Sequence, residues 1–436
     1  MTSAPLLIKV SWRNLWRNPR GTLLTALALG LGLSLLLISL GLLDGGHEQT
    51  IADGVRFGPG HVVIQAKGYQ ETNSDELLLS ARVVSSSEAF LQSDTIKQLV
   101  RGVSPRLLAT GLLSSAANAS GVRIMGVIPQ DERAVSLIPQ RMIAGSYLSN
   151  DTPPSNGRPS AAVIGIDLAR KLEVKVGSKV VLMTQALRQP GADTRNSSGD
   201  EMESTLLRVT GIFRTGLQAV DANIVQVPLP AAQSLLGVTG GQVTQVALLL
   251  AEESDSPLVA KALRRQLTDA SVEVLTWRQS IPMLAQILGL DHAFNYIMNG
   301  VILAMVGLGI LNTILMRVLE RRYEFGVCKA LGLRPGQLAV MVIGESLALT
   351  AISLSLGLVF GLSIEHYFAT SGLDLRLLFR RGLPPALVFD PILYSRLSPN
   401  RIVWSVSIVF VMATIISFYP ALKAARIDLP DALKVL

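Results

Sequence analysis

Three histidines lie beside apolar segments, where their side chains could bind a metal ion or titrate near neutral pH. His47 follows the first apolar segment, His292 precedes the second and His366 follows the third. Imidazole and carboxylate groups are common metal ligands, and imidazole titrates close to pH 7. The neighbouring carboxylates are those of Asp44, Glu48, Asp291 and Glu365. The alternative, which we favour, is that these polar residues only mark the ends of membrane spans.

One further carboxylate, Glu345, lies seven residues after Leu338 in a segment that is otherwise apolar. A carboxylate in a membrane helix is costly and usually faces other protein. It could serve as a proton-binding site. The alternative is an ion pair with an arginine such as Arg317 or Arg321, and we favour this structural role.

Patterns typical of enzymes are absent from the sequence. Gly177-Ser178-Lys179 is the nearest match to a phosphate-binding loop, but it lacks the upstream glycine and precedes a strand. The sequence contains no G-x-S-x-G, H-E-x-x-H or C-x-x-C motif, and Cys328 is the only cysteine. We therefore expect no enzyme activity, and no cofactor, in this chain.

A short amphipathic segment carries the most informative pattern. Leu319, Tyr323, Val327 and either Ala330 or Leu331 fall on one helical face, and Glu320 and Glu324 fall on another. Gly332 is placed to end this helix and Pro335 to begin the next. Such a helix could dock into a groove on a partner or lie on the lipid surface. The pattern alone leaves both alternatives open.

The histidines, Glu345 and the amphipathic segment are all positioned by long apolar segments. Four segments carry no charge: 22–43, 293–316, 346–364 and 402–422. Each approaches the roughly 20 apolar residues needed to cross a bilayer. Charged residues make up 16% of the chain, compared with roughly 25% in soluble domains. The net charge of +7 could indicate nucleic-acid binding, but much of the basic charge lies beside the spans, which favours membrane orientation instead.

The basic flanks predict the orientation and the order of the parts. Cytoplasmic flanks are rich in Lys and Arg, as are the segments before the first span, between the second and third, and after the fourth. We therefore predict cytoplasmic termini, and a location in the plasma membrane. In order, the predicted parts are an interfacial helix at 1–21, spans at 22–43, 293–316, 338–366 and 401–422, extracytoplasmic segments at 44–292 and 367–400, a cytoplasmic loop at 317–337 and a tail at 423–436.

The second extracytoplasmic segment, 367–400, does not follow this charge rule. It contains Arg376, Arg380, Arg381 and Arg396. The first three lie in an amphipathic stretch that could rest on the outer lipid surface. A solvated loop with a few arginines explains the composition equally well.

Strand and helix patterns alternate through 44–292. The two ends resemble each other, and the middle, about 115–225, reads mostly as strand. We expect a large extracytoplasmic α+β domain, with a mixed α/β lobe built from both ends and an inserted β-rich lobe. Helices are predicted at Ser86–Val100 and at Ser280–Ile297, the latter entering the second span. Arg188–Ser204 reads as a loop.

The cytoplasmic loop resembles the coupling helix of the FtsX/MacB/LolC-type permeases, which are membrane subunits of ABC transporters. Their loop commonly reads E-R-x-x-E-[FI]-G-x-x-[KR]-A-[LI]-G. The residues that match are Glu320, Arg321, Glu324, Phe325, Gly326, Lys329, Ala330, Leu331 and Gly332. Segments 13–20, 163–177 and 419–433 also resemble the family, and the order of one span, a large domain and three spans agrees with it. The resemblance covers almost the whole chain.

This resemblance implies a partner ATPase. Two permease subunits, identical or related, would bind two copies of a separate cytoplasmic ATPase that holds ATP and Mg²⁺. The matching loop residues would contact that ATPase, with Glu324 and Lys329 as polar contacts and Phe325 as an apolar anchor. The expected location is the bacterial inner membrane.

The same resemblance leaves two functions open. The first is the release of lipoproteins or other amphiphiles from the membrane, or the expulsion of periplasmic substrates. The second is an FtsX-like mechanical relay that regulates an extracytoplasmic partner, such as a cell-wall hydrolase, without transport. The large size of 44–292 favours the first. A periplasmic or outer-membrane partner is a further expectation.

Overall fold

The computed structural model describes residues 13–17, 19–72, 74–149, 159–187, 202–238, 240–374 and 392–426. The chain forms two compact units. The helical unit comprises the described residues within Met1–Glu48, Leu288–Arg380 and Pro391–Leu436. The sheet unit comprises those within Gln49–Ile287. The division falls at residues 49 and 287, a few residues inside the predicted domain limits of 44 and 292.

Four long helices make up most of the helical unit, and their bounds are α2 Pro19–Phe57, α12 Pro282–Glu320, α14 Pro335–Ser371 and α15 Pro399–Ala425. Residues 49–57 of α2 and 282–287 of α12 belong to the sheet unit. By length and composition, each of the four can cross a membrane. Each begins with a proline, which fits the first helical turn because its missing N–H has no intrahelical partner there. A shorter helix, α13 (Arg322–Ala330), separates α12 from α14, and strands β11 (Leu373–Asp374) and β12 (Ile392–Leu393) pair beyond α14.

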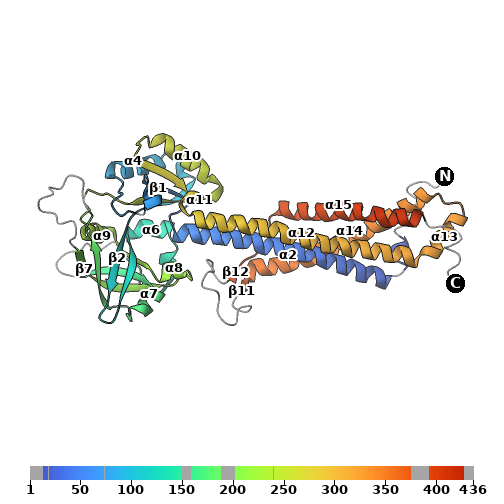
Figure 1. Ribbon diagram of the computed structural model, residues 1–436, viewed down its shortest axis with the longest axis horizontal. Coiled ribbons are helices and arrows are strands. Elements are labelled where there is room, and N and C mark those ends of the chain that lie inside the picture. The colour runs from blue at the N-terminus through green and yellow to red at the C-terminus, as the bar shows by residue number, and fades with distance from the viewer. Residues whose placement is uncertain are drawn as a thin grey trace. The chain divides into compact units, whose positions relative to one another are not determined.

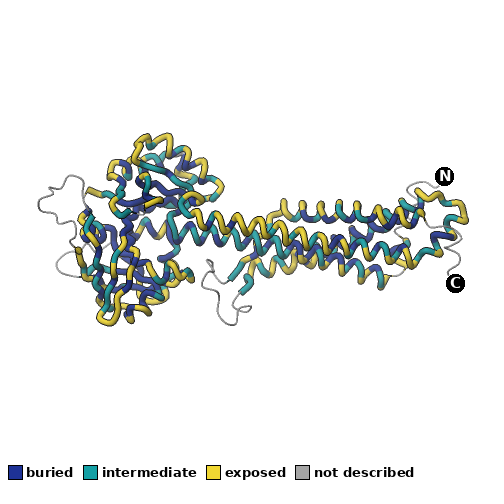
Figure 2. The backbone as a smooth tube through the Cα atoms, viewed as in Figure 1, coloured by how far each residue is buried: buried dark blue, intermediate teal, exposed yellow. Residues whose placement is uncertain are grey.

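The long helices of this unit run alongside one another (Figure 1). Small residues form the contact between α2 and α14. A Cβ atom added to Gly30 of α2 would lie 2.9 Å from the carbonyl oxygen of Ser353 in α14. Ser34 donates a hydrogen bond to the carbonyl oxygen of Gly357 at 3.0 Å. Small residues allow such close backbone contact between membrane helices. The buried faces of the helices point into the bundle and the exposed faces point outward (Figure 2).

The sheet unit contains one ten-stranded sheet with the order β10-β1-β9-β2-β3-β8-β5-β7-β4, in which β6 pairs with β2 and β7. Its strands are β1 Val62–Ala66, β2 Val100–Ser114, β3 Ala119–Val127, β4 Met142–Gly145, β5 Ser160–Gly165, β6 Lys179–Gln185, β7 Met202–Phe213, β8 Ile224–Pro228, β9 Gln245–Leu250 and β10 Val272–Thr276.

Short helices connect these strands. They are α3 Tyr69–Thr72, α4 Ala81–Leu91, α5 Asp94–Lys97, α6 Pro129–Val135, α7 Ile166–Lys171, α8 Gln218–Asp221, α9 Leu229–Leu236, α10 Ser256–Gln266 and α11 Trp277–Ser280. The fold class is confirmed: four membrane-type helices accompany a large α+β domain. The two expected lobes share one sheet, because β2 pairs with β9 through Val100–Arg106 and with β3 and β6 through Arg106–Ser114.

The helix predicted at Ser86–Val100 is present in part, but its bounds are wrong. α4 begins after Ser80 and ends at Leu91, α5 follows, and Val100 is the first residue of β2. The serines are tolerated inside α4 because their hydroxyls bond to carbonyls of the preceding turn, as Ser87 does to Val83 at 2.7 Å. The helix predicted at Ser280–Ile297 begins two residues later, at Pro282.

Several predicted segments lie wholly or partly outside the described residues. They are residues 1–12 of the interfacial helix, 188–201 of the loop Arg188–Ser204, 375–391 of the second extracytoplasmic loop and 427–436 of the tail. The last three residues of Arg188–Ser204 belong to β7.

Candidate functional site

The amphipathic segment forms α13, and its ends lie where the sequence predicts them. Gly332 has a φ of +94°, a backbone conformation that glycine adopts without strain. The N–H of Gly332 bonds to the carbonyl of Lys329 at 2.9 Å, and that of Leu333 to the carbonyl of Cys328 at 3.1 Å. This pair of bonds is a Schellman motif, which ends the helix. Pro335 then begins α14.

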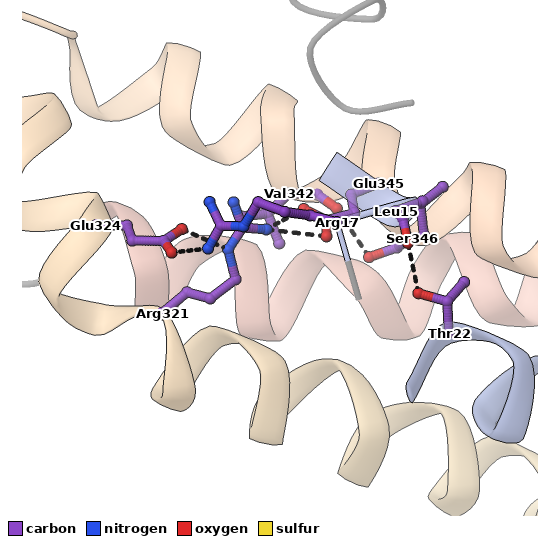
Figure 3. A network of polar contacts seen from close by, with 8 residues as sticks. All are labelled: Leu15, Arg17, Thr22, Arg321, Glu324, Val342, Glu345 and Ser346. Atoms are coloured by element: carbon purple, nitrogen blue, oxygen red, sulfur yellow. Dashed lines mark hydrogen bonds and ion pairs between the residues drawn. The ribbon is translucent and has the colours of Figure 1, made fainter. Parts of the chain in front are cut away.

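Arg321 joins the start of α13 to the membrane helix α14 (Figure 3). Its Nη1 atom donates to both carboxylate oxygens of Glu345, at 2.8 and 2.9 Å. Its Nε atom donates to Glu324 at 2.8 Å, and its guanidinium carbon lies 5.4 Å from the centre of the Phe325 ring. The carboxylate of Glu345 is therefore paired, which confirms the structural role predicted for it.

Two further contacts fix α13 to the rest of the helical unit. The carboxylate of Glu324 forms an ion pair with Arg17, which precedes α2 (Figure 3). Lys329 donates a hydrogen bond of 2.7 Å to the carbonyl oxygen of Ala425, the last residue of α15. Side chains of α13, together with Arg321 just before it, thus contact three separate parts of the chain: the residues before α2, the body of α14 and the end of α15.

Phe325 is 2% exposed and packs in the core of the helical unit. Leu338 and Val342 belong to the same core cluster. That Phe325 is an apolar anchor on a partner stays a prediction, and in this conformation its ring is buried within its own chain. Gly326 is buried beside it. The amphipathic pattern places Tyr323 and Val327 on one face of the helix. Phe325 lies on the other face, which packs against the core.

The opposite side of α13 is an exposed apolar surface, which we call the α13 outer face. Tyr323 is 49% exposed, Val327 36% and Leu331 79%. Leu319, at the end of α12, is 45% exposed. These are the residues that the sequence predicts on one helical face. Of the remaining matched residues, Glu320, Ala330 and Gly332 are also exposed.

The structure brings together two of the three histidines at the helix ends. The rings of His47 and His292 lie 4.5 Å apart, and Nε2 of His47 lies 3.6 Å from a carboxylate oxygen of Asp291. His366 is exposed. Among the described residues, no group of three or more His, Cys, Asp or Glu side chains is arranged to hold a metal ion.

The carboxylates near these histidines form ion pairs between segments of the helical unit. Asp44 of α2 contacts Arg401 of α15 at 3.0 Å. Glu48 of α2 pairs with Arg396, which precedes α15. These polar residues therefore join parts of the helical unit near the ends of its helices.

Sequence reasoning missed a buried ion pair in the sheet unit. Arg106 of β2 and Glu132 of α6 are each 1% exposed or less, and two hydrogen bonds of 2.9 Å join them. Arg106 also donates to the carbonyl of Gly58 at 2.5 Å, and Ser104 donates to Glu132 at 2.7 Å. A buried charge requires such partners. The only signal in the sequence is an arginine just before the apolar run of β2.

Two family models match the chain. Residues 22–266 match the MacB-like periplasmic core domain, and residues 296–429 match the FtsX-like permease C-terminal model. The chain is 23% identical to the lipoprotein-releasing system transmembrane protein LolC of Xylella fastidiosa, over 99% of both chains. It is 22% identical to LolE of Haemophilus influenzae, over 96% of this chain and 97% of that one.

A solved structure is also similar to part of the chain. It is the periplasmic region of MacB from Actinobacillus actinomycetemcomitans, with 11% identity and a TM-score of 0.35. The match covers 54% of this chain and 95% of that one.

Proposed function

Because the chain belongs to the FtsX-like and MacB-like family of ABC transporter permeases, we propose that it transmits the motion of a separate cytoplasmic ATPase to its sheet unit. ATP and Mg²⁺ would be bound by that ATPase, in two copies, and a second permease subunit, identical or related, would complete the transporter. This chain would contribute no catalytic residue and hold no cofactor.

The attachment of α13 is the observation that supports this proposal. Its inner side is fixed to α14 through Arg321 and Glu345, and to α15 through Lys329. Its outer face exposes Tyr323 and Leu331. An apolar helix face of this kind fits a hydrophobic groove on a partner. Force applied to the outer face would therefore reach at least two membrane helices through direct polar contacts.

The substrate that we propose is an amphiphile, with membrane lipoproteins as the first choice. LolC and LolE are named for lipoprotein release, and the chain aligns with them over nearly its whole length. An FtsX-like relay without transport is the competing function. The two functions differ in what the complex releases from the membrane when ATP is added.

The first experiment purifies the tagged chain from its native membrane in mild detergent and measures co-purifying proteins and ATPase activity. We expect an ABC ATPase in the eluate. Reconstituted with labelled lipoproteins, the complex should release them on addition of ATP. If the chain purifies alone, even after mild crosslinking, the energy-coupling proposal fails. ATP hydrolysis with nothing released favours the relay.

A charge on the α13 outer face tests the docking surface directly. In Leu331→Glu a carboxylate replaces a side chain that is 79% exposed, so the variant should fold but lose the ATPase in the purification. The matched control is Leu258→Glu in α10, where the leucine is 60% exposed. That control should retain the ATPase. Equal retention by both variants would assign the partner surface elsewhere.

A further inference from the structure

A polar cavity of about 560 Å³ lies in the helical unit between the start of α2 and the end of α12. Its volume is within the usual range for small-molecule sites, roughly 300–1,000 Å³. Gly21, Thr22 and Thr25 line it from α2, and Asn312, Thr313 and Arg317 line it from α12. The groups that bind α13 to α14, including Arg321 and Glu345, close one side of it.

The cavity lies where the apolar segments of both helices end. Thr22 is the first residue of one uncharged segment, and Arg317 is the first charged residue after another. In a membrane helix, this change from apolar to charged residues marks the boundary between the hydrocarbon core and the lipid headgroups. The cavity therefore lies at headgroup depth.

Arg317 supplies an unpaired cation in this cavity. Its side chain is partly buried, and no described residue forms a hydrogen bond or ion pair with it. The side-chain amides of Asn14 and Asn312 are also unpaired within the described part of the chain. Burial removes part of the hydration of this guanidinium, and the carboxylates of Glu345 and Glu320 attract it without forming an ion pair. Its planar fork matches the oxygens of a phosphate group.

The remaining charges of the cavity identify the kind of phosphate ligand. The lining contains three arginines and three glutamates, so the cavity has no excess charge. Arg17 and Arg321 are paired with Glu324 and Glu345, which leaves Arg317 and the exposed Glu320 as the free pair. These two residues lie three positions apart on α12. Because the cavity has no net charge and offers one cation and one carboxylate, it suits a zwitterionic ligand better than an anion.

We propose that this cavity binds the headgroup of a membrane phospholipid, with phosphoethanolamine as the preferred group. The phosphate would contact Arg317 and the amides of Asn14 and Asn312, and the ammonium would face Glu320. A lipid held there would contact α2 and α12 beside the Arg321–Glu345 ion pair. The proposal does not depend on the ATPase.

The test uses the full chain, stripped of lipid in detergent and titrated with phosphatidylethanolamine or phosphatidylglycerol of equal chain length. Native mass spectrometry counts the retained lipid. The wild type should retain one phosphatidylethanolamine more tightly than phosphatidylglycerol. Arg317→Gln should weaken that binding about tenfold, as expected for loss of a charge-assisted hydrogen bond. Arg20→Gln, which removes an exposed arginine outside the cavity, should bind as the wild type does.

Two further variants keep the test decisive if Arg317→Gln aggregates. Arg317→Lys retains the charge without the planar fork and should bind with intermediate affinity. Glu320→Gln should bind both lipids equally. Equal affinity of Arg317→Lys and the wild type, or no preference between the two lipids in the wild type, would overturn the proposal. Water-soluble phosphoethanolamine should compete for the cavity, but more weakly than the lipid. Equal affinity of the soluble ester and the lipid would assign the cavity to a soluble phosphate ester instead of a lipid.

Discussion

At the scale of single residues, His61 shows how burial controls the charge of a side chain. Its Nδ1 atom accepts a hydrogen bond of 3.0 Å from the N–H of Leu250 in β9. Burial, together with the nearby guanidinium groups of Arg101 and Arg56, lowers the pKa of His61 from 6.5 to about 4. The imidazole is therefore neutral in the folded sheet unit at neutral pH.

This lowered pKa predicts a pH-dependent loss of stability. As the pH falls from about 6.5 to about 4, the unfolded chain gains a proton at His61 that the folded chain does not, so the free energy of unfolding decreases. Below pH 4 this residue contributes no further decrease. Hydrogen exchange at the Leu250 amide, corrected for the intrinsic effect of pH, should report reduced protection at pH 4.5 compared with pH 7.5.

His61→Asn is the matched control, because an amide oxygen can accept the same hydrogen bond without titrating. The variant should lose less protection than the wild type between the two pH values. The same loss in both proteins would show that other groups control the acid sensitivity of β9.

At the scale of elements, α13 illustrates which parts of the site the sequence can predict. Its ends follow from local signals, Gly332 and Pro335, and its outer face follows from helical periodicity. The partners of Glu324 and Lys329 do not, since Arg17 and Ala425 are distant in the chain and no local pattern selects them. Both side chains were predicted to contact an ATPase, whereas the structure pairs each within the chain.

The same distinction holds for the larger elements. The four apolar segments could be located from composition alone, because a membrane span depends only on local apolarity. The path of the sheet could not, because β2 pairs with β9, more than a hundred residues away in the sequence. The Arg106–Glu132 ion pair could not be predicted from the sequence either, because both side chains become buried partners only in the folded sheet unit.

A proline substitution in α13 should abolish energy coupling without preventing the membrane helices from folding. Gly326→Pro removes a backbone N–H donor from the interior of α13 and brings a ring against the preceding turn, which costs roughly 3 kcal/mol. The four long helices do not include this residue, so membrane insertion should be retained while permease-stimulated ATPase activity is abolished. Both are measured on the purified complex in liposomes.

The control for that variant is Gly336→Ala in the first turn of α14, where an added Cβ atom meets nothing within 4 Å. It should retain stimulation. Full stimulation in Gly326→Pro would mean that an intact α13 is not required for coupling.

At the scale of the whole molecule, the proposed function requires α13 and the sheet unit to face different compartments. α13 must face the cytoplasm to meet an ATPase, whereas the sheet unit must lie on the other side to meet an extracytoplasmic substrate. The basic flanks at 1–21, 317–337 and 423–436 predict this orientation. The chain itself offers a direct probe, because Cys328 in α13 is its only cysteine.

A membrane-impermeant maleimide should label Cys328 in inverted membrane vesicles but not in cells whose outer membrane alone has been permeabilised. Lys261→Cys, combined with Cys328→Ser, moves the thiol to an exposed position of α10 and should give the opposite result. Labelling of both thiols from the same side would contradict the orientation. An α13 on the extracytoplasmic side could not reach an ATPase, so that outcome would also remove the proposed route of force transmission.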